Sequence, residues 1–181
     1  LRVGGGLFGG SGNDTVSVGG SLGGTISLGH GADVVNAGTA KAVSLSGGTE
    51  NDSFLFNGAA AASSIVGGFG ADSVRIGASL GGSTILGGQP GSGGSALDGS
   101  DTITVVSSVS SSAIYGNSGA DSILIGSSAT ASTLSGGANN DLVSVAGDVS
   151  AGQIFGGSGA DNVIVVGSLA GGATVRLDNS G

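Results

Sequence analysis

The feature that most constrains this chain is an aspartate that recurs eight times at nearly constant spacing. The intervals between successive aspartates are 19, 19, 20, 29, 20, 20 and 20 residues. The aspartates are Asp14, Asp33, Asp52, Asp72, Asp101, Asp121, Asp141 and Asp161. Each closes a turn that is mostly rich in glycine, as in the segments 9–14 and 156–161. A fixed period of this length is typical of repeat architectures, in which neighbouring units stack on one another.

Apolar residues occur at fixed distances from each aspartate. Positions two and four residues after it are apolar in all eight units, for example Val74 and Ile76 after Asp72. This alternation predicts a strand with one buried face. A second apolar column lies seven residues before the aspartate, and Ile85 completes it if the long unit carries a nine-residue insertion after that strand.

A third column stands eight residues after the aspartate, in a segment rich in Gly, Ser and Ala. It is apolar in every unit except one, which has Lys41. We interpret this segment as a second turn, so that each repeat reads strand, turn, strand, turn around a thin core of two sheets. Stacked units would make each column continuous and pair every strand with those above and below.

These patterns predict an all-β fold, a parallel β-solenoid of about eight coils of about 20 residues with no significant helix. The high glycine content, 42 of 181 residues, also disfavours helix. We expect residues 1–181 to be a single repeat solenoid that forms part of a longer repeat protein. We expect a loop insertion at residues 87–96, which contains the only proline, Pro90.

Charge and composition limit the function. Twelve acidic residues against four basic ones give a net charge of −8, which would repel nucleic acid and anionic lipid. No apolar run is long enough to insert into a membrane. There is no cysteine and only one histidine, His30. A uniform row of aspartates lacks the contrasting environments that separate an acid from a base, so we expect no catalytic residues and no enzyme activity.

Stacked carboxylates repel one another, so something must compensate their charge. Three solutions are open: bound cations, hydrogen bonds from turn amides, or raised pKa values. Calcium fits chemically, because it takes six to eight oxygen ligands and accepts carboxylates together with backbone carbonyls. Aspartates that only accept turn amides, as caps, are the alternative.

The turns resemble the repeats-in-toxin (RTX) motif Gly-Gly-x-Gly-x-Asp followed by an apolar strand, most closely at residues 9–18 and 156–165. The resemblance implies a right-handed, secreted, mostly bacterial β-roll that binds Ca²⁺ at its turns. It implies that the eight repeat aspartates are the calcium ligands: Asp14, Asp33, Asp52, Asp72, Asp101, Asp121, Asp141 and Asp161. The alternate turn of each unit carries no aspartate, so we expect one column of calcium ions rather than two.

The resulting hypothesis is an extracellular, calcium-stabilised structural segment of a surface-layer, filament or adhesin-like protein. Outward apolar side chains, among them Phe8, Tyr115 and Phe155, lead us to expect self-association or packing against other domains. One alternative is a binding module for carbohydrate or ice, suggested by the outward ladder Thr25, Ser44, Ser64, Thr84 and Thr133. Another is the repeat spacer of a secreted toxin or enzyme.

Overall fold

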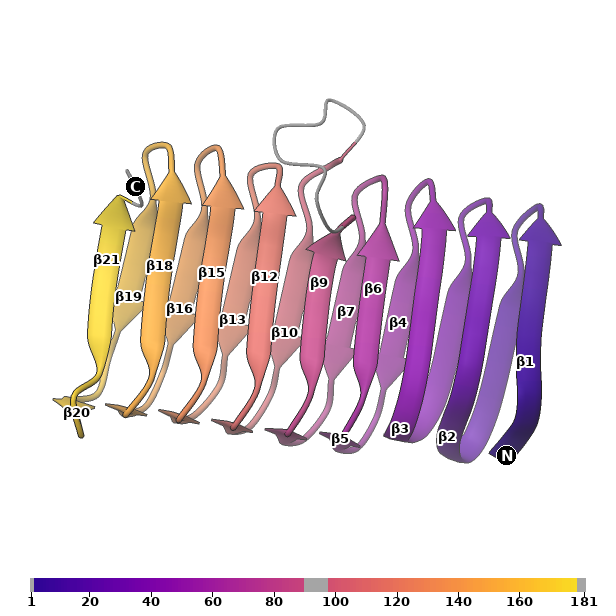
Figure 1. The fold of residues 1–181 in the computed structure, drawn as a ribbon, viewed down its shortest axis with the longest axis horizontal. Coiled ribbons are helices and arrows are strands. Elements are labelled where there is room, and N and C mark those ends of the chain that lie inside the picture. Colours follow the sequence, from indigo (N-terminus) through magenta and orange to yellow (C-terminus); the bar gives the residue numbers. More distant parts are fainter. Residues whose placement is uncertain (1, 90–97, 179–181) are drawn as a thin grey trace.

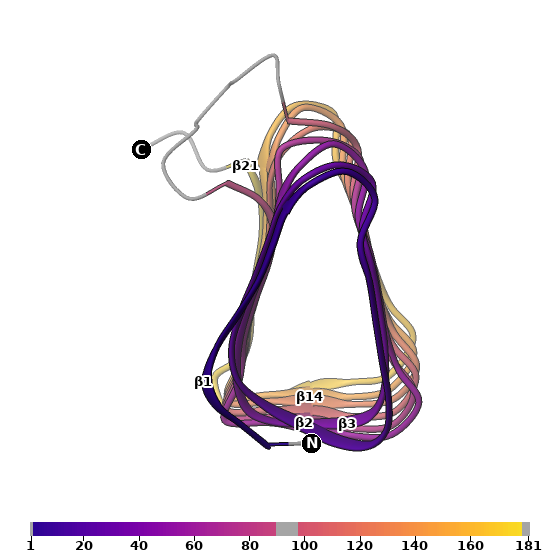
Figure 2. The ribbon, with the colours of Figure 1, turned by 90° about the vertical axis from the view of Figure 1, so that its right-hand side faces the viewer.

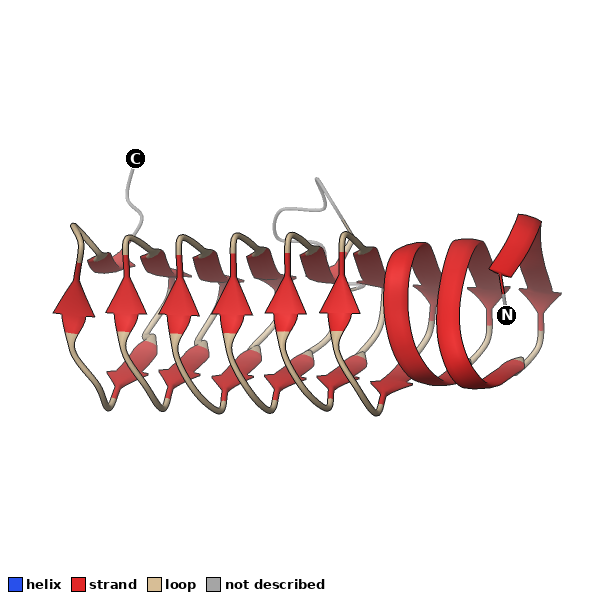
Figure 3. Cartoon of the chain, turned by 90° about the horizontal axis from the view of Figure 1, so that it is seen from below, coloured by secondary structure: helices blue, strands red, loops and turns tan. Residues whose placement is uncertain are grey.

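The computed structural model describes residues 2–89 and 98–178, and these form 21 strands and no helix (Figure 1). No helix able to cross a membrane occurs in these ranges. The strands wind into eight stacked coils, preceded by β1 (Figures 1 and 3). The prediction of an all-β parallel solenoid is therefore confirmed.

Each coil has three faces, which give it a triangular cross-section (Figure 2). Face 1 follows the aspartate and contains β4 (Ser53–Phe56), β7 (Ser73–Ile76), β10 (Thr102–Val105), β13 (Ser122–Ile125), β16 (Leu142–Val145) and β19 (Asn162–Val165). Face 2 contains β5 (Ala60–Ala61), β8 (Leu80–Gly81), β11 (Val109–Ser110), β14 (Ala129–Thr130), β17 (Val149–Ser150) and β20 (Leu169–Ala170). Face 3 leads into the next aspartate turn and contains β1 (Arg2–Ser11), β6 (Ser64–Gly68), β9 (Thr84–Gly88), β12 (Ala113–Ser118), β15 (Thr133–Ala138), β18 (Gln153–Ser158) and β21 (Thr174–Asp178). In the first two coils β2 (Thr15–His30) and β3 (Val34–Thr49) run round all three faces.

Face 2 corrects the expectation of a two-sheeted core. The segment interpreted as a second turn is a short strand that pairs in parallel with its equivalents in adjacent coils. Its inward residue, such as Leu80 or Val109, is fully buried. The position assigned to Lys41 was also wrong, because Ala40 pairs with Leu22 and Ala60 and is buried, whereas Lys41 is exposed. The strand was missed because it is only two residues long in most coils and its outward residues are mostly Gly, Ser and Ala, which are poor indicators of β-structure.

Parallel pairing keeps equivalent residues in register along the rod. On face 3, Ile65 pairs with Ile85 and Ile85 pairs with Ile114, although 29 residues separate the last two. The extra residues therefore leave the stack undisturbed, and Ile85 completes its column as predicted. Of the expected insertion, Gly87 and Gly88 belong to β9, and residues 90–97 lie outside the described residues.

The core is a row of mostly aliphatic side chains with two fully buried phenylalanines, Phe54 and Phe56. Almost every predicted inward residue of the six middle coils is buried, which confirms the columns on faces 1 and 3. Side chains at the two ends are only partly covered: Leu7 and Val16 at one end, Val163 and Val165 at the other. Burial in a solenoid requires a coil on both sides, and the end coils have only one.

The corner between faces 2 and 3 is stabilised by a row of buried serines. Its outer residues adopt left-handed backbone angles, with φ of 49° at Ala131 and 48° at Ser111. Just after them, the hydroxyl of Ser112 accepts the amide of Ser83 (3.1 Å) and donates to the carbonyl of Ser110 (2.8 Å). Ser132 continues the pattern, accepting the Ser112 amide at 3.2 Å. These bonds satisfy the backbone groups that the bend would otherwise leave unpaired.

Candidate metal centre: a buried carboxylate ladder

The eight repeat aspartates form one continuous ladder at the apex between faces 3 and 1. Each follows the turn that ends a face-3 strand and precedes a face-1 strand, so stacking places equivalent carboxylates one above another. The six inner aspartates are at most 3% exposed: Asp33, Asp52, Asp72, Asp101, Asp121 and Asp141. The terminal ones, Asp14 and Asp161, are partly exposed. All the predicted ligands thus belong to a single array.

From Asp33 to Asp161, one oxygen of each carboxylate accepts a hydrogen bond from the coil before it. The backbone amide of each aspartate donates to Oδ1 of the next aspartate along the ladder, at 2.7 Å from Asp72 to Asp101 and 2.7 Å from Asp101 to Asp121. Seven such bonds run from Asp14 to Asp161, at 2.7–3.0 Å. The alternative role considered for the aspartates, as acceptors of hydrogen bonds from backbone amides, therefore describes one of their two carboxylate oxygens, Oδ1.

The other carboxylate oxygen has no partner. Oδ2 of all eight aspartates is buried and lacks a hydrogen bond among the described residues. Burying a polar atom without a partner costs about 1–3 kcal/mol, and more when the group is charged. A row of eight such atoms calls for a compensating group.

Oδ2 packs over a glycine five residues before most of the aspartates. A Cβ atom built on Gly67 would collide both with Oδ2 of Asp72 and with the carbonyl oxygen of Gly87 in the next coil. The same two kinds of oxygen converge at five further glycines: Gly9, Gly47, Gly116, Gly136 and Gly156. Two aspartates depart from the pattern: the buried Leu28 stands five residues before Asp33, and Asp101 lies against Gly87, on the other side of the long interval. Because glycine has no side chain, a carboxylate oxygen and a carbonyl oxygen can both lie close to the position that its Cβ atom would occupy.

Burial raises the pKa of five inner carboxyls of the ladder. It raises the pKa of Asp101 to about 8, despite the amide hydrogen bond from Asp72, which lowers it. Burial likewise raises the pKa to about 7 for Asp52, Asp72 and Asp121 and to about 6 for Asp141, and neighbouring carboxylates add to the increase. Without a cation, these five carboxyls therefore hold protons near neutral pH.

The donor set fits a hard cation. It supplies only carboxylate and carbonyl oxygens, the ligands that Ca²⁺ takes, and no sulfur or imidazole. Within the described residues no three acidic, histidine or cysteine side chains converge on one point, so any ion would depend on backbone carbonyls as well. The residues that would hold it are the ladder aspartates and the glycine-turn carbonyls. A bound ion would supply positive charge that neutralises Oδ2 and ties adjacent coils together.

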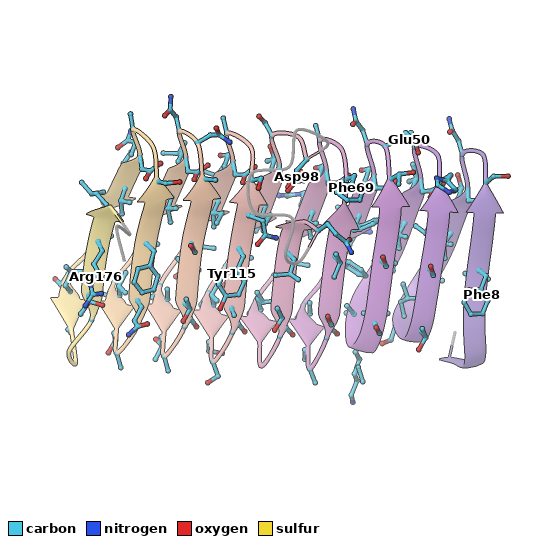
Figure 4. The ribbon with its side chains drawn as sticks, turned by 45° about the horizontal axis from the view of Figure 1, so that its top comes forward. Phe8, Glu50, Phe69, Asp98, Tyr115 and Arg176 are labelled. Carbon is cyan, nitrogen blue, oxygen red and sulfur yellow. The ribbon has the colours of Figure 1, made fainter. Side chains whose placement is uncertain are left out.

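Two features of the apex were not expected from the sequence. The side chain of Asn51 accepts the amide of Ala71 at 2.8 Å, and Asn13 and Asn140 do the same for the next coil. The Asn that immediately precedes the aspartate in these units was the sequence feature that could have predicted these hydrogen bonds. The other feature is Asp98, whose carboxylate lies at the apex beside the ladder (Figure 4).

The proposed hydroxyl ladder lies on face 3, at its border with face 2. Thr25, Ser44, Ser64 and Thr84 are consecutive partners in the parallel register, but Ala113 separates Thr84 from Thr133. Thr25, Ser44 and Ser64 are exposed, whereas Thr84 and Thr133 are half-buried. A shallow groove of about 530 Å³ follows the first four, with Ala42 and Ala62 also in its lining.

The fold and the ladder define a parallel β-solenoid with a single column of stacked carboxylates. No protein-family model and no curated protein matches the chain. The chain is similar to one solved structure, a hyperactive, Ca²⁺-dependent, beta-helical antifreeze protein from an Antarctic bacterium, with 23% sequence identity and a TM-score of 0.73. The match covers 97% of this chain and 62% of that protein, and at this identity it shows the fold alone.

Proposed function

We propose that the chain is a calcium-stabilised β-solenoid of the RTX type with a structural, non-catalytic role in an extracellular protein. The observation that carries the proposal is the row of buried Oδ2 atoms without hydrogen-bond partners. The RTX-like turn motif of this chain and the Ca²⁺ dependence of the similar antifreeze protein support calcium as the ion. The eight repeat aspartates would be the carboxylate ligands.

Calcium in this role acts by charge. Each ion would neutralise carboxylates of adjacent coils and bind turn carbonyls, so that metal binding and coil stacking stabilise each other. Millimolar extracellular calcium fills sites of modest affinity, whose dissociation constants lie at about 10⁻⁴–10⁻³ M. This favours a secreted surface-layer, filament or adhesin-like parent, in which outward side chains contact other copies or domains. A spacer in a secreted toxin or enzyme would use the ladder in the same way.

The test combines metal content with circular dichroism on the chain before and after exhaustive chelation. We expect several calcium ions per chain, loss of thermal stability on chelation, and recovery when calcium returns. Magnesium, added at the same concentration, is the matched control, because it demands a tighter octahedral site. A chain that binds no calcium and melts at the same temperature in chelator and in calcium would overturn the proposal.

Ice binding is the second candidate function. The hydroxyl side chains of Thr25, Ser44, Ser64 and Thr84 form an in-register row along one edge of the solenoid, and the similar solved structure is an antifreeze protein. The candidate is tested by thermal hysteresis of the double variant Ser44→Lys/Ser64→Lys. The control places lysines at Ser53 and Ser73, exposed residues on face 1. Activity that is lost only in the face-3 variant supports ice binding, and absence of activity in the unaltered chain rejects it.

A further inference from the structure

One coil carries a second carboxylate beside the ladder. Asp98 stands three residues before Asp101, at the variable position of the turn. The equivalent residues of the other coils are not acidic: Ser11, His30, Thr49, Phe69, Ser118, Ala138 and Ser158. The coil with the 29-residue interval is therefore chemically distinct from the other seven.

Asp98 is fixed by contacts on three sides. Its Oδ2 accepts the backbone amide of Ser118 at 3.3 Å, and its backbone pairs with Gly70 of the preceding coil. A Cβ atom on Gly88 would collide with the Asp98 carboxylate. The side-chain amide of Asn117 donates to the carbonyl of Gly88 at 2.9 Å, which holds this glycine in place.

The Asp98 and Asp101 carboxylates lie against adjacent residues of the same strand. The Asp98 carboxylate packs against Gly88. A Cβ atom on the preceding residue, Gly87, would collide with Oδ2 of Asp101. Each carboxylate has one buried oxygen without a partner, Oδ1 in Asp98 and Oδ2 in Asp101. The Asp101 side chain is 2% exposed, so water does not solvate this oxygen. Burial is the main cause of the raised pKa of Asp101, and the charge of Asp98 adds to it, as it also does for the pKa values of Asp72 and Asp121, so Asp98 acts on this part of the ladder.

We propose that Asp98 adds an extra carboxylate to the calcium site at Asp101, so that this two-carboxylate site of one coil binds more tightly than the ladder positions of the other coils, which have only their repeat aspartates. The inference rests on the proposed calcium function and specifies where binding begins. Calcium affinity rises with the number of charged ligands at a site. Asp98 adds one full negative charge at a place where a ladder carboxylate is already buried and unpartnered. The site lies between the coils of β9 and β12, near the middle of the rod (Figure 1).

The test is a calorimetric calcium titration of the chelator-stripped, full chain. The key variant is Asp98→Asn, which keeps the size of the side chain and an oxygen for the Ser118 amide. The matched control is Asp148→Asn, which removes the same charge from an exposed aspartate outside the ladder that accepts the Ser168 amide (2.7 Å). We expect the unaltered chain to show one tight site followed by weaker ones. Asp98→Asn should weaken the tight site about tenfold or more, whereas Asp148→Asn should leave it unchanged.

A second variant, Asp98→Ser, guards against misfolding of the first, since serine occupies the equivalent position in three other coils. Circular dichroism verifies the fold of each variant. If calcium binds but all sites are equal, or if Asp98→Asn and Asp148→Asn titrate alike, the two-carboxylate site is rejected and the ladder proposal survives. If the unaltered chain binds no calcium, both proposals fail.

Discussion

At the scale of single residues, the glycines beneath the carboxylates explain why the turn sequence is so restricted. Gly67 does not need an unusual backbone angle; it needs the absence of a side chain. A methyl group there would meet Oδ2 of Asp72 on one side and the backbone oxygen of Gly87 on the other. The backbone oxygen cannot rotate away, so the two coils would have to separate.

We therefore expect Gly67→Ala to lower the free energy of unfolding by about 1–3 kcal/mol through overpacking. The substitution should also weaken calcium binding, because the added methyl group displaces Oδ2 of Asp72 and the carbonyl oxygen of Gly87. Chemical denaturation with and without calcium measures both effects. The control is Gly20→Ala, where a Cβ atom would meet nothing within 4 Å. Equal losses in the two variants would contradict the role assigned to Gly67.

Substitution of a ladder aspartate should have opposite effects with and without metal. Asp101→Asn removes a buried group whose pKa is raised to about 8, while a side-chain oxygen remains to accept the Asp72 amide. In chelator at pH 9 the unaltered chain must bury this carboxylate in its charged form, so the variant should melt at a higher temperature. In calcium it should melt lower than the unaltered chain, because a ligand is lost. Melting temperatures that fall in both conditions would argue against an unpaired charge at this position.

At the scale of the structural element, the ladder makes stability depend on pH. Five inner aspartates have an ordinary pKa of 3.8 when exposed, and burial raises the pKa to between about 6 and about 8 in the fold: Asp52, Asp72, Asp101, Asp121 and Asp141. Between these values the folded chain binds more protons than the unfolded chain. Stability of the metal-free chain therefore falls as pH rises from about 4 to about 8.

Calcium should reverse this trend, since it binds the ionised form and competes with protons. We expect the increase in melting temperature caused by calcium to grow between pH 6 and pH 8, the range in which these groups titrate. Melting curves in chelator and in calcium across this range test the prediction. Metal-free stability that is constant or rises with pH would contradict it.

The serine row at the opposite corner gives an independent test of the coil. Ser112→Ala removes the acceptor of the buried Ser83 amide, and an unsatisfied buried donor costs about 1–3 kcal/mol. The neighbouring Ser110→Ala is the control, because Ser110 is exposed. Denaturant unfolding compares the two, with a clearly larger loss expected for Ser112→Ala. Calcium affinity should change little in either variant, as this corner is remote from the ladder.

The sequence predicted the strands whose inward residues are large and regularly spaced. The columns through Val74 and Ile85 defined faces 1 and 3 and even the register across the insertion. Face 2 could not be predicted in the same way, because short strands with alanine and serine on the outside look like turns. The aspartate column was visible from spacing alone. That each of these carboxylates has one hydrogen-bonded oxygen and one oxygen without a partner could not be predicted, because this depends on the orientation of the side chain. The position of Asp98 near Asp101 could not be predicted either, because it depends on the path of the chain across the long interval.

At the scale of the whole molecule, each coil contacts only the coils next to it. Stability is then close to a sum of coil and interface terms, and the ends have fewer interfaces. Hydrogen–deuterium exchange should show the slowest amides in the coils around Ile103 and Ile123, with protection decreasing toward Val16 and Val163. Uniform protection along the rod would instead indicate one cooperative unit.

The same arrangement predicts that position along the rod determines the cost of a cavity. Ile123→Ala, in a fully buried position, should cost about 2–5 kcal/mol. Val163→Ala, on the partly covered end coil, removes fewer buried contacts and should cost less. Denaturation of the two variants provides the comparison, and equal costs would contradict the model of independent neighbours.

The in-register pairing across a 29-residue interval has an evolutionary consequence. A gene for such a chain tolerates two kinds of length change: extra codons within a turn, and the duplication or loss of a whole coil between equivalent aspartates. Removal of residues 122–141, for example, would bring Asp121 directly before Asp161 in the ladder and match like columns again. Unequal recombination between similar repeats can therefore alter the length of the rod in single-coil steps while each product retains a continuous core.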